Sequence, residues 1–443
     1  MVKIYSTVLF LFFSTLAFSQ AGHIMQGVGA VNMSMGGAAT GQPLDISGAL
    51  QWNPAAISSF DEKIIKFDIG IFFSSPELRS TVPEFDESGQ PTGNFYSGTT
   101  KDDRGVSPMP ALAMVWGKEN SKHTFGASIF GISGFGVTFP ENMSNPINMP
   151  QSAGGFGRIE SDYSLLQAGF TYAYNFSDNF SVGISPTINY ASLKLLPNPT
   201  ANPTAAGYPG TDRASAIGFG GQVGLFYNSD SGFKAGLSYK TVQHFSDFEF
   251  DNTYLDNATS TNKFKMDYPA IFSAGLGYSV GDLDLALDYR MVDYENTDGF
   301  SETGWTQAGS VRGFGWENMD VISAGIQYKG IGRLPLRVGY TYSSVPIKNE
   351  VAFFNIPATA IIENAFQVGF TFEATSSLNF DVVYHHGSSN KETAGPLLNP
   401  MFAQNYPPHG AIPGSEVSYE MTTDLVMLGV SYTFKKKESN EID

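Results

Sequence analysis

The stretch Asp282-Leu-Asp-Leu-Ala-Leu-Asp-Tyr-Arg290 alternates between apolar and polar side chains. Successive side chains of a β-strand point to opposite faces of the sheet. One face of this strand therefore carries large apolar side chains, namely Leu283, Leu285, Leu287 and Tyr289. The other face carries Ala286 and the four charged side chains of the stretch, which are Asp282, Asp284, Asp288 and Arg290. A sheet with lipid on one side and a polar lumen on the other has this pattern, so the stretch predicts a strand of a transmembrane β-barrel.

The same alternation recurs in about fourteen stretches between residue 61 and Phe434, which is the period expected of an outer-membrane barrel. Other clear examples begin at Phe366, Leu378 and Val426. Every second connection is short and has the composition of a tight turn. These short joins are Gly117 to Ser121, Asn175 to Asn179, Asn228 to Gly232, Val280 to Asp282, Lys329 to Arg333 and Glu373 to Ser377. Short turns on one side and long loops on the other predict an all-β antiparallel barrel with an even strand number and both chain ends in the periplasm.

Aromatic side chains gather where strands meet the short joins. Amphipathic rings prefer the headgroup level of a membrane, so we interpret this set as the girdle at the inner interface. Its members are Tyr172, Tyr174, Phe176, Phe180, Tyr227, Phe233, Tyr278, Tyr328, Phe370, Phe372, Phe380, Tyr432 and Phe434.

Composition excludes several other classes of protein. The 443 residues include no cysteine, which excludes disulfides, thiolate metal sites and a cysteine nucleophile. The net charge of −17 disfavours a nucleic-acid partner. His385 and His386 are adjacent, so on a strand they face opposite ways, and no GxSxG or HExxH motif accompanies them. We predict no enzyme activity, no metal and no cofactor.

Residues 1–19 are predicted to be a cleaved signal peptide. Lys3 precedes an apolar run from Val8 to Phe18, and Ala17-Phe18-Ser19 supplies small residues before a cut at Gln20. Export to the outer membrane of a Gram-negative bacterium follows, since a strand barrel needs that destination.

Residues 20–60, the N-terminal segment, do not continue the strand pattern. The segment contains Gly36 and Gly37, which permit close backbone approach, as well as Asp45 and the corner Asn53-Pro54-Ala55. It has no lipid-facing stripe, and a ring of about fourteen strands would otherwise enclose an aqueous hole. We therefore predict that it is a hatch inside the lumen, followed by the barrel (61–434) and a periplasmic tail (435–443).

Several of these residues carry a likeness to a known family. The run from Gly29 through Met35-Gly36-Gly37-Ala38, Asp45 and Asn53-Pro54-Ala55 resembles the hatch of the FadL-type outer-membrane transporters of long-chain fatty acids and other hydrophobic compounds. Similar strand motifs are Leu336-Arg337-Val338-Gly339-Tyr340, Val345-Pro346-Ile347 with Ile356-Pro357, and Tyr268-Pro269 to Gly277-Tyr278.

The resemblance implies a monomeric barrel of fourteen strands in outer-membrane lipid and lipopolysaccharide. A hydrophobic ligand such as a long-chain fatty acid would leave sideways through a gap made by a kink in the third strand. That strand is Thr124 to Phe139, and its candidate kink residues are Gly131, Gly134 and Gly136, because glycine inside a strand marks bends.

Four further residues are candidate ligand contacts. Tyr208, Phe248 and Phe250 lie in loops that match by position the outer groove of that family, and Arg337 faces the lumen. We expect Arg337 and Arg290 to pair with a lumen acid such as Asp284 or Asp288. Two other readings stay open at this point, a diffusion porin for small polar solutes and a purely structural or adhesive barrel.

Overall fold

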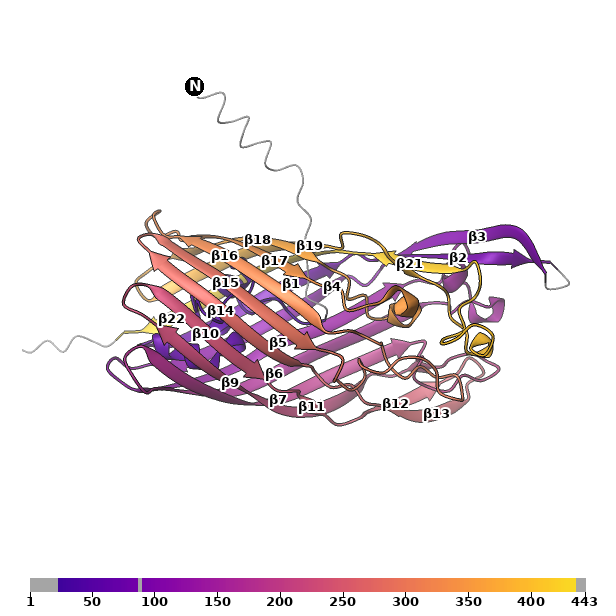
Figure 1. Ribbon diagram of the computed structural model, residues 1–443, viewed down its shortest axis with the longest axis horizontal. Helices are drawn as coiled ribbons and strands as arrows, with labels where there is room; N and C mark the ends of the chain where they lie inside the picture. The colour runs from indigo at the N-terminus through magenta and orange to yellow at the C-terminus, as the bar shows by residue number, and fades with distance from the viewer. Residues whose placement is uncertain (1–22, 87–89, 436–443) are drawn as a thin grey trace, which may run out of the picture.

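The computed structural model of the chain describes residues 23–86 and 90–435, and it is a closed antiparallel barrel of 14 strands (Figure 1). The barrel strands are β1 (Lys63–Ser74), β4 (Val106–Trp116), β5 (His123–Phe139), β6 (Ile159–Asn175), β7 (Phe180–Leu196), β9 (Ala214–Asn228), β10 (Phe233–Lys240), β14 (Ala270–Val280), β15 (Leu283–Asp293), β16 (Met319–Tyr328), β17 (Leu336–Ser343), β18 (Asn364–Glu373), β19 (Leu378–Ser388) and β22 (Thr422–Phe434). The predicted signal peptide and residues 436–443 of the tail lie outside the described residues.

The ring closes where the last strand meets the first. β22 pairs with β1 from Lys63 opposite Phe434 to Ser74 opposite Thr423. Each barrel strand pairs with its two neighbours in the order of the chain. The predicted short joins all connect consecutive barrel strands, so the predicted barrel and its strand number are confirmed.

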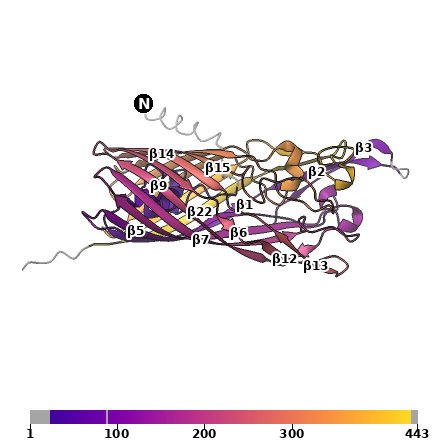
Figure 2. The ribbon, with the colours of Figure 1, turned by 60° about the horizontal axis from the view of Figure 1, so that its bottom comes forward.

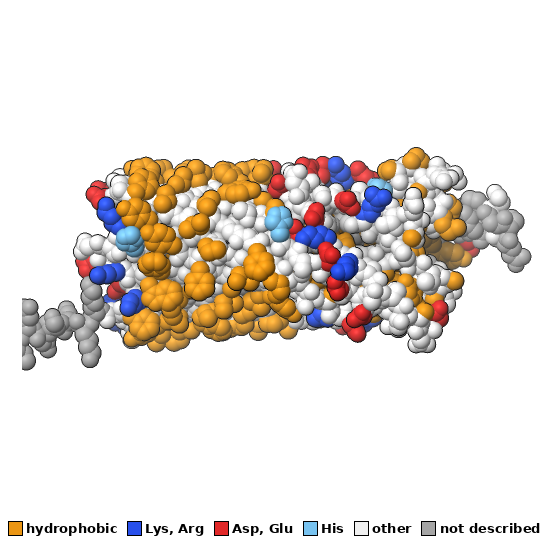
Figure 3. Space-filling view, turned by 90° about the horizontal axis from the view of Figure 1, so that it is seen from below, with side chains coloured by type: hydrophobic (Ala, Val, Ile, Leu, Met, Phe, Trp, Pro, Cys, Tyr) orange, Lys and Arg blue, Asp and Glu red, His pale blue; other side chains and the backbone are white. Residues whose placement is uncertain are grey.

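The two faces of the wall match the alternation in the sequence. Leu287 is 50% exposed and its neighbour Asp288 is 1% exposed, as expected for one lipid-facing and one lumen-facing side chain. Hydrophobic side chains form a broad band on the face of the barrel that Figure 3 shows. Rings at the turn end of this band contact one another, for example Phe180 and Tyr227 with centroids 4.6 Å apart.

Two smaller sheets extend the barrel on the side of the long loops (Figure 1). One consists of β2 (Glu77–Phe85), β3 (Pro91–Lys101), β20 (Thr393–Gly395) and β21 (Glu416–Glu420), and the other of β8 (Gly210–Thr211), β12 (Phe248–Thr253) and β13 (Thr259–Phe264). The short strand β11 (His244–Phe245) pairs with β9. Short 3-10 helices η2 (Pro146–Asn148), η3 (Gln151–Ala153), η4 (Asn349–Asn355) and η5 (Pro400–Phe402) lie in the loops. The sequence predicts that these connections are loops without strands, and this prediction is wrong. Strands outside the membrane need no lipid-facing stripe, so the alternation that marks the barrel strands does not reveal them.

Residues 23–60 lie inside the barrel, near the end with the short turns (Figure 2). They form α2 (Ala30–Ser34), α3 (Ile46–Trp52) and the 3-10 helix η1 (Pro54–Ser59). Every residue of α2 and α3 is buried, because barrel side chains surround both helices. Within the described residues no helix is long and apolar enough to cross a membrane.

Candidate functional site

The wall of the barrel is open between β4 and β5. The two strands pair from Trp116 opposite Phe125 to Ala111 opposite Phe130, and in the described structure their pairing ends there. β4 nevertheless continues to Val106 beside β1. Pro108 and Pro110 lie in this half of β4 and have no N–H to donate, so they suit a strand edge without a partner. The part of β4 from Val106 to Pro110 therefore presents an unpaired edge toward β5.

The facing half of β5 is irregular and binds the N-terminal segment instead. Gly131 pairs with Leu166 and Ser133 with Leu165, which leaves Ile132 as the extra residue of a bulge. Beyond the bulge, Ser133 forms a bridge with Ile24, and Met25 N donates to Ile132 O at 3.0 Å. A bulge bends its strand. Beyond the bulge, β5 no longer pairs with β4 and instead binds the N-terminal segment inside the lumen.

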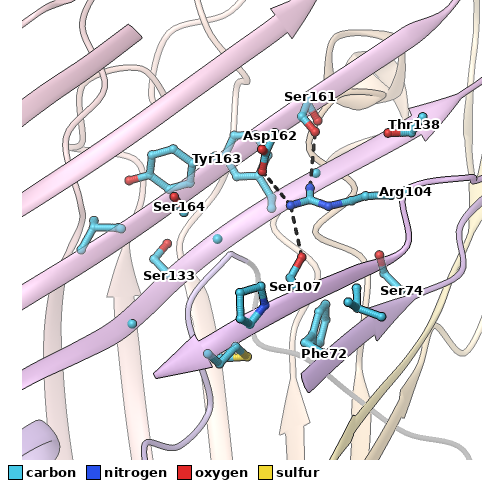
Figure 4. Close-up of a pocket in the computed structure, with 18 of the residues that line it drawn as sticks. Phe72, Ser74, Arg104, Ser107, Ser133, Thr138, Ser161, Asp162, Tyr163 and Ser164 are labelled. Atoms are coloured by element: carbon cyan, nitrogen blue, oxygen red, sulfur yellow. Dashed lines mark hydrogen bonds and ion pairs between the residues drawn. The ribbon is translucent and has the colours of Figure 1, made fainter. Parts of the chain in front are cut away.

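A cavity of about 650 Å³ occupies the opening, and we call it the notch (Figure 4). Its outer end is polar and its deeper end is mainly apolar. The outer end carries Arg104, Ser107, Thr138, Ser161 and Asp162, and the deeper end carries Met109, Pro110, Leu165 and Leu166 together with the hydroxyl groups of Ser133 and Ser164. The notch thus has the polarity of an amphipathic molecule that stands upright in the outer leaflet.

Arg104 fixes the outer end of the notch. Its guanidinium donates to Asp162 Oδ1 at 2.7 Å, to Ser107 Oγ at 3.3 Å and to the carbonyl oxygen of Ser161 at 3.3 Å (Figure 4). The neighbouring Asp102 carboxyl accepts from the backbone of Thr138 and Arg104, and burial raises its pKa. These bonds hold the polar end in place.

The three predicted kink glycines all line the notch, each with different surroundings. A Cβ at Gly136 would lie 1.1 Å from Arg104 Nη1, so the guanidinium occupies the space of the missing side chain. At Gly134 a Cβ would lie 3.1 Å from the carbonyl oxygen of Tyr163. At Gly131 the nearest atom would be Pro110 O at 3.6 Å, so this position has room for a side chain.

Behind the notch an aromatic cluster fills the lumen around His23. The His23 ring stacks on Phe300 with centroids 4.8 Å apart, and its Nδ1 lies 2.7 Å from the hydroxyl of Tyr294. Further rings within about 6 Å complete a cage, since offset and edge contacts between rings are favourable at such distances. They belong to Phe135, Tyr163, Tyr268 and Trp316. His23 thereby separates the notch from the interior.

A buried ionic cluster ties the N-terminal segment to the wall. Lys66 of β1 is 2% exposed, and its Nζ lies 2.6 Å from Asp381, 3.0 Å from Asp45 and 3.8 Å from Asp68. Asp45 caps α3 by accepting from Gly48 N at 3.0 Å, and Asp68 accepts from Ala30 N at 2.9 Å. One lysine therefore neutralises acids from both the segment and the barrel.

A second cluster holds the segment on the opposite wall. Asp288 accepts from the backbone N–H groups of Ala39 and Thr40, both at 2.9 Å, and pairs with Arg290 at 3.0 Å. Arg290 also donates to the carbonyl oxygen of Gly37 and covers the ring of Trp52 at 3.7 Å. The expected pairing of Arg290 with a lumen acid is confirmed.

Wall glycines let the backbone of the segment approach closely. A Cβ at Gly236 would lie 1.8 Å from Thr40 O, one at Gly224 2.1 Å from Asn53 Oδ1, and one at Gly339 2.1 Å from Gly36 N. Gly36 and Gly37 have φ of +69° and +80°, which glycine adopts without strain. Contact between the two backbones thus depends on glycine on both sides.

The Asn53-Pro54-Ala55 corner also packs against the wall. Asn53 is extended, with φ −152° and ψ 103°, as the proline after it requires. Its amide donates to Thr40 O at 2.9 Å and to Leu225 O at 3.0 Å, and Ala55 O accepts from Ser181 Oγ at 3.1 Å. This corner leads the chain from the lumen to β1.

The structure does not bring the four candidate ligand contacts together. Phe248 and Phe250 are buried in β12, and Tyr208 donates to Gly309 O at 2.5 Å in the outer loops. Arg337 lies near the short turns, where it donates to Gln327 at 2.7 Å and to Thr371 at 2.6 Å. Its predicted ion pair with a lumen acid is wrong among the described residues, because these neutral side chains stand between the guanidinium and Asp284 or Asp381.

Sequence reasoning missed Arg104, Pro108, His23 and Lys66. A signal existed for one of them, because two prolines spaced by one residue inside a strand pattern mark a free sheet edge. The partners of Arg104, His23 and Lys66 lie far away in the chain, so no local pattern could reveal them.

A closed strand barrel with a lipid-facing band and an occupied lumen defines an outer-membrane channel protein. A family model described as "Outer membrane protein transport protein (OMPP1/FadL/TodX)" matches residues 11–435. The chain belongs to this family of outer-membrane transport proteins, which are channels rather than enzymes.

Curated relatives and solved structures agree with this assignment. The chain is 22% identical over 395 residues to a long-chain fatty acid transport protein of Escherichia coli O6:H1, covering 79% of this chain and 83% of the relative. The corresponding protein of Salmonella typhi is 21% identical over 392 residues, covering 80% and 84%. A FadL homologue of Pseudomonas aeruginosa has a TM-score of 0.70 at 15% identity, covering 94% of this chain and 100% of the other. The toluene transporter TodX of P. putida has a TM-score of 0.66 at 16% identity, covering 93% and 99%. At these identities the structures establish the fold.

Proposed function

We propose that this protein, acting as a monomer, takes up long-chain fatty acids or other hydrophobic small molecules passively and releases them sideways into the membrane through the notch. The observation that carries the proposal is the missing β4–β5 pairing between residue 110 and the bulge at Ile132, where the cavity of about 650 Å³ lies. The names of the curated relatives support the class of cargo.

Sideways release has a thermodynamic reason. Each CH₂ group that reaches the hydrocarbon gains about 0.8 kcal/mol. A path along the full lumen would instead require passage through residues 23–60, most of which are buried and which are hydrogen-bonded to the wall on two sides. A route through the notch bypasses α2 and α3 and requires the cage of rings around His23, at the start of this segment, to open.

The polarity of the notch favours an amphipathic cargo. A carboxylate beside Arg104, Ser107 and Thr138 would find hydrogen-bond donors, while its chain would lie on Met109 and Leu166. Tyr208, Phe248 and Phe250 remain candidates for the first contact with such a molecule. Because Phe248 and Phe250 are buried, the outer loops would have to move before either ring could meet it.

The rival proposal, an open diffusion porin, finds no support in the lumen. Two buried ionic clusters and the aromatic cage occupy the space through which polar solutes would pass. We therefore keep the hatch as part of the proposal.

The test is uptake of a labelled long-chain fatty acid by bacteria that lack their own transporter. Gly131→Val places a branched side chain in the notch, where a Cβ meets no atom closer than 3.6 Å. We expect wild-type protein to raise uptake and Gly131→Val to lower it at equal surface abundance.

The matched control is Gly221→Val in β9, where a Cβ would lie 3.4 Å from Ser185 O and outside the notch. Uptake by Gly221→Val should equal that of the wild type. Normal uptake by Gly131→Val would refute release through the notch, and no uptake by a correctly inserted wild type would refute the proposed cargo.

A further inference from the structure

A charged cluster lies on the membrane side of the barrel wall, beside the notch. In β6 the lipid-facing side chains have even numbers, as Leu166 at 39% and Phe170 at 73% exposure illustrate. Asp162 and Glu160 belong to the same face, two and three steps of the alternation beyond Leu166. Charged side chains gather directly beyond one end of the hydrophobic band (Figure 3). The cluster therefore stands at the level of the lipid headgroups.

Three strands contribute cations to this face. Lys194 of β7 lies an even number of residues from the lipid-facing Ile188 and Tyr190, so it shares their face of the sheet. Arg213, just before β9, lies four residues before the lipid-facing Ile217 and shares its face. Arg158 precedes β6 by one residue and pairs with Glu160. All of them point away from the lumen, so a partner on the lipid side can reach them.

Cations outnumber acids in the two ion-pair groups. Glu160 binds Arg158 at 2.9 Å and Lys194 at 2.6 Å, and Asp162 binds Arg104 at 2.7 Å and also Arg213. Each carboxylate thus has two cations, although the whole chain carries a net charge of −17. The side chains of Arg158 and Arg213 remain 45% exposed and that of Lys194 33%.

Other acids nearby are turned elsewhere. Asp102 accepts from two backbone N–H groups, and the backbone N–H of Asp103 donates to Thr138 O at 2.8 Å, which ties this acid to β5. Glu141 is the next acid near Arg158, close to Gly157. The outward excess of positive charge therefore persists on the face that borders the lipid.

We propose that Arg158, Lys194 and Arg213 form a docking site for a phosphate group of an outer-leaflet lipid, whose acyl chains lie on Phe170, Ile188 and Tyr190. Guanidinium groups present paired donors that match phosphate oxygens, and clusters of basic residues at a membrane surface recognise anionic headgroups. The site spans β6, β7 and β9. Lys194 and Arg213 lie outside the notch, whereas Arg158 also lines it, so competition between lipid A and a fatty acid decides whether the occupant is a resident lipid or a molecule in transit.

The test measures binding of purified phosphorylated lipid A to the full-length protein in detergent by native mass spectrometry. The variant Arg158→Gln/Lys194→Gln/Arg213→Gln removes the three exposed cations. We expect its affinity for lipid A to fall about 10- to 100-fold. The single variant Arg213→Gln, expected to lower affinity less, serves if the triple variant does not fold.

The matched control removes three other exposed, ion-paired lysines of the outer loops, Lys101, Lys263 and Lys348, each changed to Gln. Its affinity for lipid A should equal that of the wild type. Equal loss in both variants, or equal binding of dephosphorylated lipid A to the wild type, would overturn the proposal. Stronger competition by sodium oleate than by lipid A would also overturn it, because the site would then serve a carboxylate cargo. Fatty acid uptake is measured separately, so failure here leaves the transport proposal untouched.

Discussion

Replacing Lys66 by methionine should release the N-terminal segment from the wall. Lys66 is the cation shared by Asp45 of the segment and by Asp68 and Asp381 of the barrel, at 3.0, 3.8 and 2.6 Å. Methionine keeps most of the side-chain volume and removes the charge. Three buried carboxylates would then face one another without their common partner.

The expected size of the effect follows from this burial. Removing one partner of a buried ion pair costs about 3–5 kcal/mol, because the remaining charge has lost its compensation. At about 1.4 kcal/mol for each factor of ten, a cost that acts on docking of the segment raises the displaced population roughly 100- to 4,000-fold. Displacement moves Asp45 away from Asp68 and Asp381, so the barrel relieves the repulsion while its strands remain paired.

Ion conductance in planar lipid bilayers measures the displaced state. We expect long-lived openings in Lys66→Met and rare ones in the wild type. The milder variant Asp45→Asn removes the segment's acid and keeps the barrel pair of Lys66 with Asp381, so it should show an intermediate frequency.

Lys118→Met is the control, since Lys118 is an exposed residue of a short turn and loses the same charge. It should conduct as the wild type does. Heat-dependent mobility in gels establishes that each barrel is folded. A folded Lys66→Met protein with wild-type conductance would refute the role given to the cluster.

Three other perturbations address the lumen and the outer loops. Deleting residues 21–52 should leave a folded barrel that conducts ions far better than the wild type, and unchanged conductance would contradict the plug. Gly236→Ala, whose Cβ would lie 1.8 Å from Thr40 O, should destabilise docking by about 1–3 kcal/mol and lower the temperature at which the segment becomes accessible to protease; Gly221→Ala should not. Burial lowers the pKa of the outer-loop His409 below its usual value of 6.5, so the folded loop binds a proton more weakly than the unfolded one and loses stability as the pH falls below that value. Protease cleavage near His409 should therefore increase from pH 7 to pH 5 in the wild type and stay constant in His409→Gln.

The membrane-embedded part of the fold could be predicted from the sequence because lipid imposes a strict rule on every strand. Asp288 and Leu287 differ in exposure as the alternation requires, and the short turns fall where Gly, Asn and Asp punctuate the chain. The hairpin of β12 and β13 escaped prediction since both its faces meet protein or water, and no lipid-facing stripe marked it.

The candidate site was less accessible to sequence reasoning. Gly131, Gly134 and Gly136 could be singled out from their position in one strand, but their three different environments depend on Pro110, Tyr163 and Arg104. Arg337 shows the converse limit, because alternation places it in the lumen without identifying Gln327 and Thr371 as its partners. Alternation assigns a face, whereas partners depend on the register of distant strands.

The pairing of β1 with β22 sets an order of events for biogenesis. This pairing places Lys63 of β1 opposite Phe434 of β22, so the ring of strands cannot close until the last strand has been exported. Residues 23–60 lie just ahead of β1 and make contacts around the ring, from β4 to β19. α2 contacts β22 and α3 contacts β1, so the segment bridges the two strands whose pairing closes the ring. This bridge can be complete only after both of these strands have been exported.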